Sequence, residues 1–120
     1  MIRICIVDDD SSVRKSLANL LKSAGYQTIV FASGEEFLDS PASAEAACVL
    51  LDLRMRGLQG LEVQQVLKAR AARIGVICMS AHDDPDSVSR ALAAGAACFL
   101  RKPFSEAVLL RSIMTVLDHP

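Results

Sequence analysis

The residues most capable of chemistry in this sequence are carboxylates that follow apolar segments. Asp8 and Asp9 follow segment 2–7, and Asp52 follows segment 47–51. A carboxylate can act as a nucleophile and form an aspartyl phosphate. Two like charges about 4 Å apart repel by about 4 kcal/mol at an effective dielectric near 20, so a cluster of these groups would need a cation. Mg²⁺ suits it because one or two carboxylates, water and phosphate complete its shell, whereas calcium would need more protein oxygens.

A hydroxyl and a lysine follow two further apolar segments. Ser80 comes directly after segment 74–79, and Lys102 lies two residues beyond segment 97–100. Lys102 offers a mobile charge that could pair first with a carboxylate and then with a phosphate. Phosphoryl transfer needs mainly alignment and charge neutralisation, which Mg²⁺, Ser80 and Lys102 would provide. A glycine-rich phosphate loop is missing after the first segment, where three aspartates stand instead.

Five apolar segments alternate with helical patterns along the whole chain. Strands apolar throughout are covered on both faces, as in a parallel sheet with helices on each side. The sequence therefore predicts a doubly wound α/β fold, in which ligands bind beyond the carboxyl ends of the strands. Asp10 should cap the first helix, and a polar loop should surround Pro41. The predicted strands are 2–7, 27–31, 47–51, 74–79 and 97–100, and the predicted helices begin near residues 11, 34, 60, 85 and 105.

Length and composition are those of a single domain. The chain has 120 residues and a formal net charge of -1, so we expect one domain spanning 1–120, with 118–120 as a potential linker start. This charge favours neither direct nucleic-acid binding nor an anionic membrane surface. No apolar run is long enough to cross a bilayer. The sequence has four cysteines, none of them in a CxxC pair: Cys5, Cys48, Cys78 and Cys98. We expect them to be reduced thiols in the core, which predicts a cytoplasmic location for the protein.

Four motifs resemble the signatures of response-regulator receiver domains, the CheY-like superfamily. They occur in the family's order, each at the end of a predicted strand, and the resemblance covers essentially the whole chain. It implies a flavodoxin-like (βα)5 fold with a five-stranded parallel sheet in the order 2-1-3-4-5. The motifs are Val7-Asp8-Asp9-Asp10, Leu51-Asp52-Leu53-Arg54-Met55, Met79-Ser80-Ala81 and Lys102-Pro103-Phe104.

The resemblance implies a role for each residue of the acidic site. Asp52 would be the phosphoacceptor. Mg²⁺ would be held by Asp9, Asp52 and the backbone carbonyl of Arg54, with Asp8 acting through water. Lys102 would contact the phosphoryl group.

The resemblance also implies a switch and a cis peptide bond. Ser80 would turn toward the phosphoryl group, and the rotamer of Phe99 would follow that hydroxyl. The bond between Lys102 and Pro103 would be cis, an isomer that costs little only before proline.

Smaller details resemble FixJ-type transcriptional regulators. Such a protein would receive its phosphoryl group from a sensor histidine kinase, assist its own phosphorylation and dephosphorylation, and form a homodimer on phosphorylation. It would reach DNA only through an output domain that these residues do not contain. The details are Ser12-Val13-Arg14-Lys15-Ser16-Leu17, Phe31-Ala32-Ser33, Arg54 and His82.

Two other functions remain open from the sequence. The pattern Asp8-x-Asp10-x-Ser12 resembles the nucleophile motif of haloacid-dehalogenase-type phosphatases, in which Asp8 would be the nucleophile. No acidic pair follows Lys102 on a further strand, as that family would require. The second alternative is a receiver-like interaction module that is never phosphorylated.

Three residues near the acceptor could tune the reaction: Arg54, Arg56 and His82. Arg54 and Arg56 could equally be plain surface charge, and Phe99 plain core.

Arg56 is a departure from the family's usual Met-Pro-Gly, because this chain has Met55-Arg56-Gly57. Proline fixes φ and stiffens a turn, so we predict a looser loop and an altered phosphoryl lifetime. Measuring the lifetime on wild type and Arg56→Pro tests this expectation. Equal lifetimes would contradict it.

Overall fold

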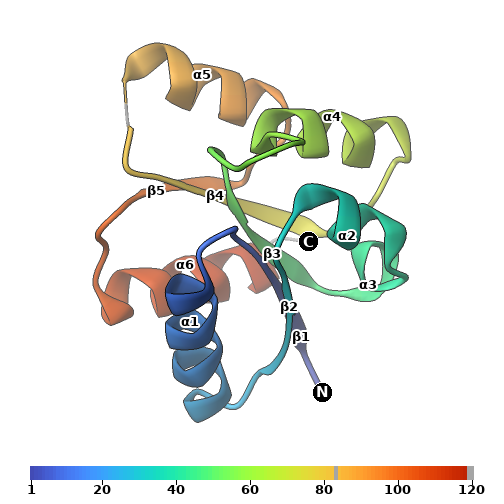
Figure 1. Cartoon of the computed structure of the whole chain (residues 1–120). Coiled ribbons are helices and arrows are strands. Elements are labelled where there is room, and N and C mark those ends of the chain that lie inside the picture. The colour runs from blue at the N-terminus through green and yellow to red at the C-terminus, as the bar shows by residue number, and fades with distance from the viewer. Residues whose placement is uncertain (83, 119–120) are drawn as a thin grey trace.

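The computed structural model, which describes residues 1–82 and 84–118, has one five-stranded parallel sheet (Figure 1). Its strand order is β2-β1-β3-β4-β5, which confirms the predicted doubly wound topology. The strands are β1 Arg3–Val7, β2 Gln27–Phe31, β3 Cys48–Asp52, β4 Gly75–Ser80 and β5 Cys98–Arg101. The helices are α1 Ser11–Ser23, α2 Gly34–Asp39, α3 Ala42–Glu45, α4 Gly60–Ala69, α5 Pro85–Ala93 and α6 Glu106–Asp118.

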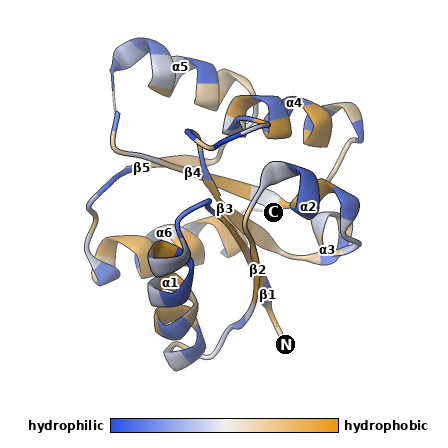
Figure 2. Cartoon of the chain, in the orientation of Figure 1, coloured by the Kyte–Doolittle hydropathy of each residue, from blue (hydrophilic) through white to orange (hydrophobic). Residues whose placement is uncertain are grey.

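Two layers of helices cover the two faces of the sheet. Successive strand residues point to opposite faces, so Cys5 and Val7 pack toward α2, α3, α4 and α5, whereas Ile4 and Ile6 pack toward α1 and α6. Both sets are fully buried. The strands are accordingly hydrophobic along their length, while the helices show mixed faces (Figure 2). This double coverage explains why the inner strands β1, β3 and β4 are mostly apolar in the sequence.

Three of the predicted strands are displaced by one residue. The structure ends β3 at Asp52, β4 at Ser80 and β5 at Arg101. The reason is the parallel ladder, in which Asp52 pairs with Met79 and Ser80 with Arg101. The polar residues at these positions therefore belong to the strand ends and share their rigidity.

The predicted loop around Pro41 is shorter than expected, because only Ser40 and Pro41 separate α2 from the short helix α3, which was not predicted. Pro41 has helical dihedral angles, with φ -56° and ψ -23°, and proline is compatible with the first turn of a helix. The hydroxyl of Ser40 accepts a hydrogen bond from the Ala42 N–H at 3.2 Å. Ala42 and Ser43 are buried, so tertiary packing stabilises this turn.

The predicted cap of the first helix is confirmed. One carboxylate oxygen of Asp10 accepts hydrogen bonds from the N–H groups of Ser12 at 2.8 Å and Val13 at 3.4 Å. The cap satisfies donors that have no partner within the helix. It also holds the chain that connects β1 to α1, so the position of the preceding aspartates is well defined.

The four cysteines are free thiols, as predicted. Burial raises the pKa of Cys5 to about 11 and the pKa values of Cys48 and Cys78 to about 12, so these thiols stay protonated at neutral pH. Within residues 1–82 and 84–118, no helix has the length and apolarity needed to span a membrane. Of the expected linker start, Asp118 ends α6, and residues 119 and 120 lie outside the described residues.

Gly60 allows α4 to begin directly against the end of β3. A Cβ atom at this position would lie 2.6 Å from the backbone oxygen of Asp52 and 2.7 Å from the Cα of Leu53. Both neighbours are backbone atoms at the acceptor strand and cannot turn aside. Close backbone approach is therefore possible here only for glycine.

We predict that Gly60→Ala lowers the free energy of unfolding by about 1–3 kcal/mol, because the added methyl overpacks a rigid site. This loss should occur although alanine favours helices. Chemical denaturation monitored by circular dichroism measures it. The exposed α1 substitution Asn19→Ala serves as control, with an expected change below about 0.5 kcal/mol; an equal effect of both would contradict the prediction.

Candidate functional site

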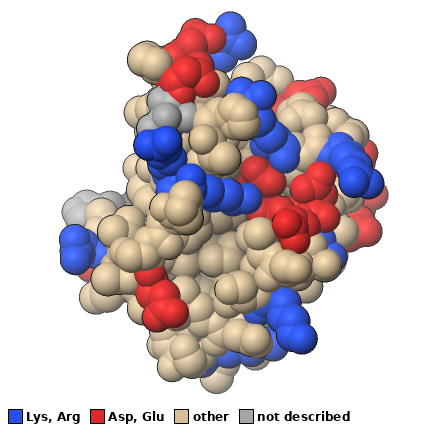
Figure 3. Space-filling model, turned by 60° about the vertical axis from the view of Figure 1, so that its left-hand side comes forward, with Lys and Arg blue, Asp and Glu red and all other residues tan. Residues whose placement is uncertain are grey.

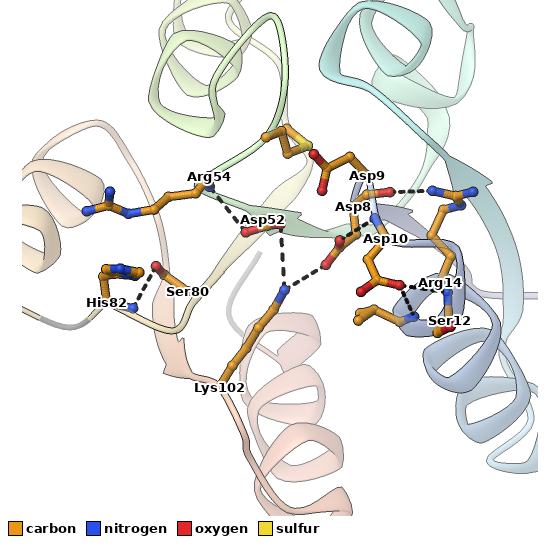
Figure 4. Close-up of polar contacts among 12 residues, drawn as sticks. Asp8, Asp9, Asp10, Ser12, Arg14, Asp52, Arg54, Ser80, His82 and Lys102 are labelled. Carbon is orange, nitrogen blue, oxygen red and sulfur yellow. Dashed lines mark hydrogen bonds and ion pairs between the residues drawn. The ribbon is translucent and has the colours of Figure 1, made fainter.

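Three carboxylates meet at the carboxyl edge of the sheet. Asp8 and Asp9 follow β1, and Asp52 ends the neighbouring strand β3. One oxygen from each lies within 4.8 Å of the others, and Figure 4 shows the three side chains directed toward a common region. The wider face carries a concentration of acidic side chains with basic ones around it (Figure 3). The predicted clustering of these residues is thus present in the fold.

Lys102 bridges the two buried carboxylates. Its Nζ lies 2.7 Å from Oδ2 of Asp8 and 3.6 Å from Oδ2 of Asp52, as the dashed lines in Figure 4 show. The Lys102 N–H donates to the Ser80 carbonyl at 2.8 Å, which ties the lysine backbone to the end of β4. The peptide bond from Lys102 to Pro103 is cis. The side chain reaches over β4 to the acidic pair, so its charge offsets part of their repulsion.

The pocket disfavours the ionised form of Asp52. Burial and the charge of Asp8 raise the pKa of Asp52 from 3.8 to about 6, although Lys102 and the N–H of Arg54 oppose the rise. Burial alone would lower the pKa of Lys102, but its hydrogen bond to Asp8 and the charges of both aspartates outweigh that effect and raise it. The site therefore has surplus negative charge near neutral pH that one lysine does not fully compensate.

Asp8 is held on both sides. Its Oδ1 accepts the N–H of Asp10 at 2.9 Å and its Oδ2 receives Lys102. Arg14 donates to the backbone oxygen of Asp8 at 2.8 Å. The residue is only 1% exposed. Contacts to both carboxylate oxygens and to the backbone oxygen thus fix the position of Asp8.

The loop between β3 and α4 is tied to the acidic cluster through backbone N–H groups. Arg54 N–H donates to Oδ1 of Asp52 at 3.2 Å, and Arg56 N–H donates to Oδ2 of Asp9 at 3.1 Å. Leu58 N–H donates to Oε1 of Glu35, on α2, at 3.3 Å. The expected looseness of this loop stays a prediction, although these bonds restrain it at three points.

Ser80 lies at the end of β4 and is only 2% exposed. Its hydroxyl oxygen accepts a hydrogen bond from the N–H of His82 at 3.0 Å (Figure 4). This bond leaves the hydroxyl proton available for another acceptor. The His82 residue is exposed and takes part through its backbone.

Phe99 occupies the middle of β5, where it pairs with Cys78 of β4. It is partly buried and packs against the core cluster under α4 and α5. Phe99 therefore connects the face of those helices with β5, the strand that Lys102 follows. A change of its rotamer would alter the packing of this face.

The contacts of Arg14, Glu35 and Gln59 were missed by sequence reasoning. Gln59 caps α4 and accepts the N–H of Met55 at 3.1 Å. Glu62 accepts the Gln59 N–H at 3.0 Å, but glutamine is not a preferred N-cap residue, so the sequence carried no cap signal here. Arg14 and Glu35 form hydrogen bonds with backbone groups. The sequence pattern of side chains gives no sign of where such backbone partners lie.

The chemistry of the donor set suits a hard divalent cation. All three clustered side chains offer carboxylate oxygens, and the ligand preference of Mg²⁺ is for oxygen. Asp9 is exposed, so an ion could enter from solvent while Asp8 and Asp52 line the inner side. The residues present therefore fit a cation that would relieve the remaining repulsion.

Comparisons with known proteins point to one family. The response regulator receiver domain matches residues 4–114 of the chain. The transcriptional regulatory protein FixJ of Azorhizobium caulinodans is 39% identical over 114 residues, which cover 95% of this chain and 54% of FixJ. The response regulator protein TodT of Pseudomonas putida strain F1 is 38% identical over 114 residues, covering 95% of this chain and 50% of TodT. The chain thus spans about half the length of these relatives.

Solved structures share the whole fold. The crystal structure of FixJ-N superposes with a TM-score of 0.88 at 31% identity, covering 100% of this chain and 96% of that chain. The Vibrio cholerae chemotaxis protein CheY4 superposes with a TM-score of 0.90 at 26% identity, covering 98% of this chain and 99% of that chain. The similarity extends over the sheet and all its helices.

The raised pKa of Asp52 predicts that its charge destabilises the metal-free fold. The folded chain binds the Asp52 proton more tightly than the unfolded chain, so stability from this group is present below about pH 4 and is lost as the pH rises toward 6. We predict that Asp52→Asn in EDTA raises the free energy of unfolding by about 1–2 kcal/mol at pH 7.5. The gain should disappear near pH 4.

Denaturant unfolding at the two pH values measures this effect. The exposed Asp39→Asn controls for the loss of one carboxylate and should change stability by less than about 0.5 kcal/mol. A loss of stability for Asp52→Asn at pH 7.5 would show that the pairing with Lys102 outweighs burial and repulsion.

Proposed function

The chain belongs to the response regulator receiver family, and we propose that it accepts a phosphoryl group on Asp52 from a phosphohistidine of a sensor histidine kinase. The observation that carries this proposal is the bridging of Asp8 and Asp52 by Lys102 within a cluster of three carboxylates. Asp52 ends a rigid strand, and its Oδ1 is oriented by the Arg54 N–H. Its second oxygen faces the lysine that would later hold the phosphoryl group.

The proposed ligands of Mg²⁺ are Asp9, Asp52 and the backbone carbonyl of Arg54, with Asp8 acting through a water molecule. When bound, Mg²⁺ would neutralise the carboxylates and the oxygens of the incoming phosphoryl group. An Asp52 oxygen forms the new O–P bond as the P–N bond to the kinase imidazole breaks. The imidazole keeps the electrons of that bond and takes a proton from solvent. Lys102 then contacts the phosphoryl oxygens and stabilises the added charge.

Phosphorylation adds a charge of about -1.5 to -2 at Asp52. In the proposed switch, the Ser80 hydroxyl turns to donate to a phosphoryl oxygen and loses the N–H of His82. Phe99, which packs against the core under α4 and α5, then follows the hydroxyl with a change of rotamer. The two packings differ in the surface around α4, β5 and α5, so the charge biases a two-state element.

Residues 1–120 are proposed to act as the receiver domain of a longer transcription regulator, because the relatives are about twice as long. The output domain would bind DNA, and the phosphorylated receiver would form a homodimer. The domain would assist its own phosphorylation and dephosphorylation. Arg54, Arg56 and His82 border the acceptor and are proposed to tune these rates.

The phosphatase alternative has less support. The match to the receiver domain covers residues 4–114, and the structure of FixJ-N superposes on the whole chain. Asp8 already holds the Lys102 ammonium at 2.7 Å. Asp8 is therefore proposed to position Lys102 and a metal-bound water.

We predict that incubation with Mg²⁺ and acetyl phosphate adds one phosphoryl group to the wild type and none to Asp52→Asn. Intact mass spectrometry measures the adduct. Asp10→Asn is the matched control: it removes a carboxylate from the same aspartate run but keeps a good helix cap, so its adduct should persist.

Three outcomes separate the alternatives. An adduct that persists in Asp52→Asn and is lost in Asp8→Asn would support the phosphatase. No adduct on any variant, together with no beryllofluoride binding, would support an interaction module that is never phosphorylated. Loss of the adduct in Asp52→Asn supports the receiver mechanism, also where Asp8→Asn weakens the adduct, because Asp8 is proposed to position Lys102.

A further inference from the structure

Arg56 contacts the acidic cluster through its backbone N–H. Its N–H donates to Oδ2 of Asp9 at 3.1 Å across 47 positions of sequence. Two residues on, the Leu58 N–H donates to Glu35 at 3.3 Å. Between them Gly57 adopts φ 74°, a left-handed conformation that suits glycine. The turn thereby presents successive backbone donors to carboxylates from two other segments.

Asp9 depends on this contact more than its neighbours depend on theirs. Asp8 is held by Asp10 and Lys102, and Asp52 by Lys102 and the Arg54 N–H. Asp9 is exposed. Among residues 1–82 and 84–118, the Arg56 N–H is its one hydrogen-bond donor. Without that donor, an exposed aspartate beside two other carboxylates would turn into solvent to reduce repulsion.

We infer that Arg56 is a positioning residue whose backbone N–H holds Asp9 in the orientation that binds Mg²⁺. The inference rests on the proposed function, because it takes Asp9 as a metal ligand. Hydrogen bonds to ligating carboxylates orient them, and losing such a partner typically lowers metal affinity about 10- to 100-fold. Arg56 N–H occupies one side of Oδ2 and leaves Oδ1 and the remaining lone pairs of Asp9 for the ion.

The residue type at position 56 matters because only proline removes the donor. A proline here would stiffen the turn but could not hold Asp9. With arginine, the turn has an N–H that can donate to Asp9, but φ at this position is no longer fixed by a proline ring. The effect belongs to the N–H, so any non-proline residue at this position should retain it.

The test is the affinity for Mg²⁺ of wild type, Arg56→Pro and Arg56→Ala, measured by isothermal titration calorimetry on residues 1–120. We expect Arg56→Pro to bind about tenfold more weakly. Arg56→Ala removes the side chain but keeps the N–H, so its affinity for Mg²⁺ should stay within about twofold of wild type. Thermal unfolding in EDTA checks that each variant is folded.

The outcomes distinguish the proposed metal site from the positioning role of Arg56. Failure of the wild type to bind Mg²⁺ would overturn the proposed metal site itself. Wild-type binding with unchanged or tighter binding by Arg56→Pro would overturn the positioning role alone. Equal weakening by both substitutions would assign the effect to the side chain and would also overturn it.

A measurement on the amide itself decides the matter even if Arg56→Pro does not fold. We expect exchange of the Arg56 amide hydrogen, followed by NMR, to be faster in Asp9→Ala than in wild type. In wild type saturated with Mg²⁺, exchange should stay as slow as in EDTA. Faster exchange with Mg²⁺ would show that the ion displaces the N–H, and would overturn the inference.

Discussion

The ammonium of Lys102 lies between Asp8 and Asp52, at 2.7 and 3.6 Å, and the arrangement of the whole sheet edge depends on it. Two buried carboxylates this close would otherwise leave uncompensated charge in a poorly solvated place, which costs several kcal/mol per ion. Strand order makes the contact possible. β1 and β3 are neighbours, and the long stem of Lys102 reaches them across β4.

The compensation is incomplete, and this is what makes the site responsive. Two carboxylates share one lysine, a third stands at the solvent edge, and the pKa of Asp52 remains raised. A divalent cation or a change in charge at Asp52 therefore alters the repulsion among the three carboxylates, which Lys102 only partly offsets. Rigid strand ends and close backbone packing at Gly60 keep the groups from relaxing apart.

Much of this could be predicted from the sequence, because buried parallel strands leave a strong apolar signal. The five strands, the positions of Asp8, Asp52 and Lys102, and the cap at Asp10 followed from local pattern. The ends of β3, β4 and β5 were displaced by one residue, because hydrogen-bond register rather than hydrophobicity decides where a ladder stops. The helix α3 was missed because burial of Ala42 and Ser43 stabilises a turn too short to show a period.

Sequence alone determined which side chains could do chemistry and the edge at which they meet, since residue type and apolar alternation are local properties. Only the tertiary structure decided which partner each group has. Asp8 and Asp9 are adjacent and identical in type, yet one is buried on Lys102 and the other is exposed and held by the Arg56 N–H. The physical reason is that backbone donors carry no sequence signature. Every residue except proline has the same N–H, and only the fold determines where it points.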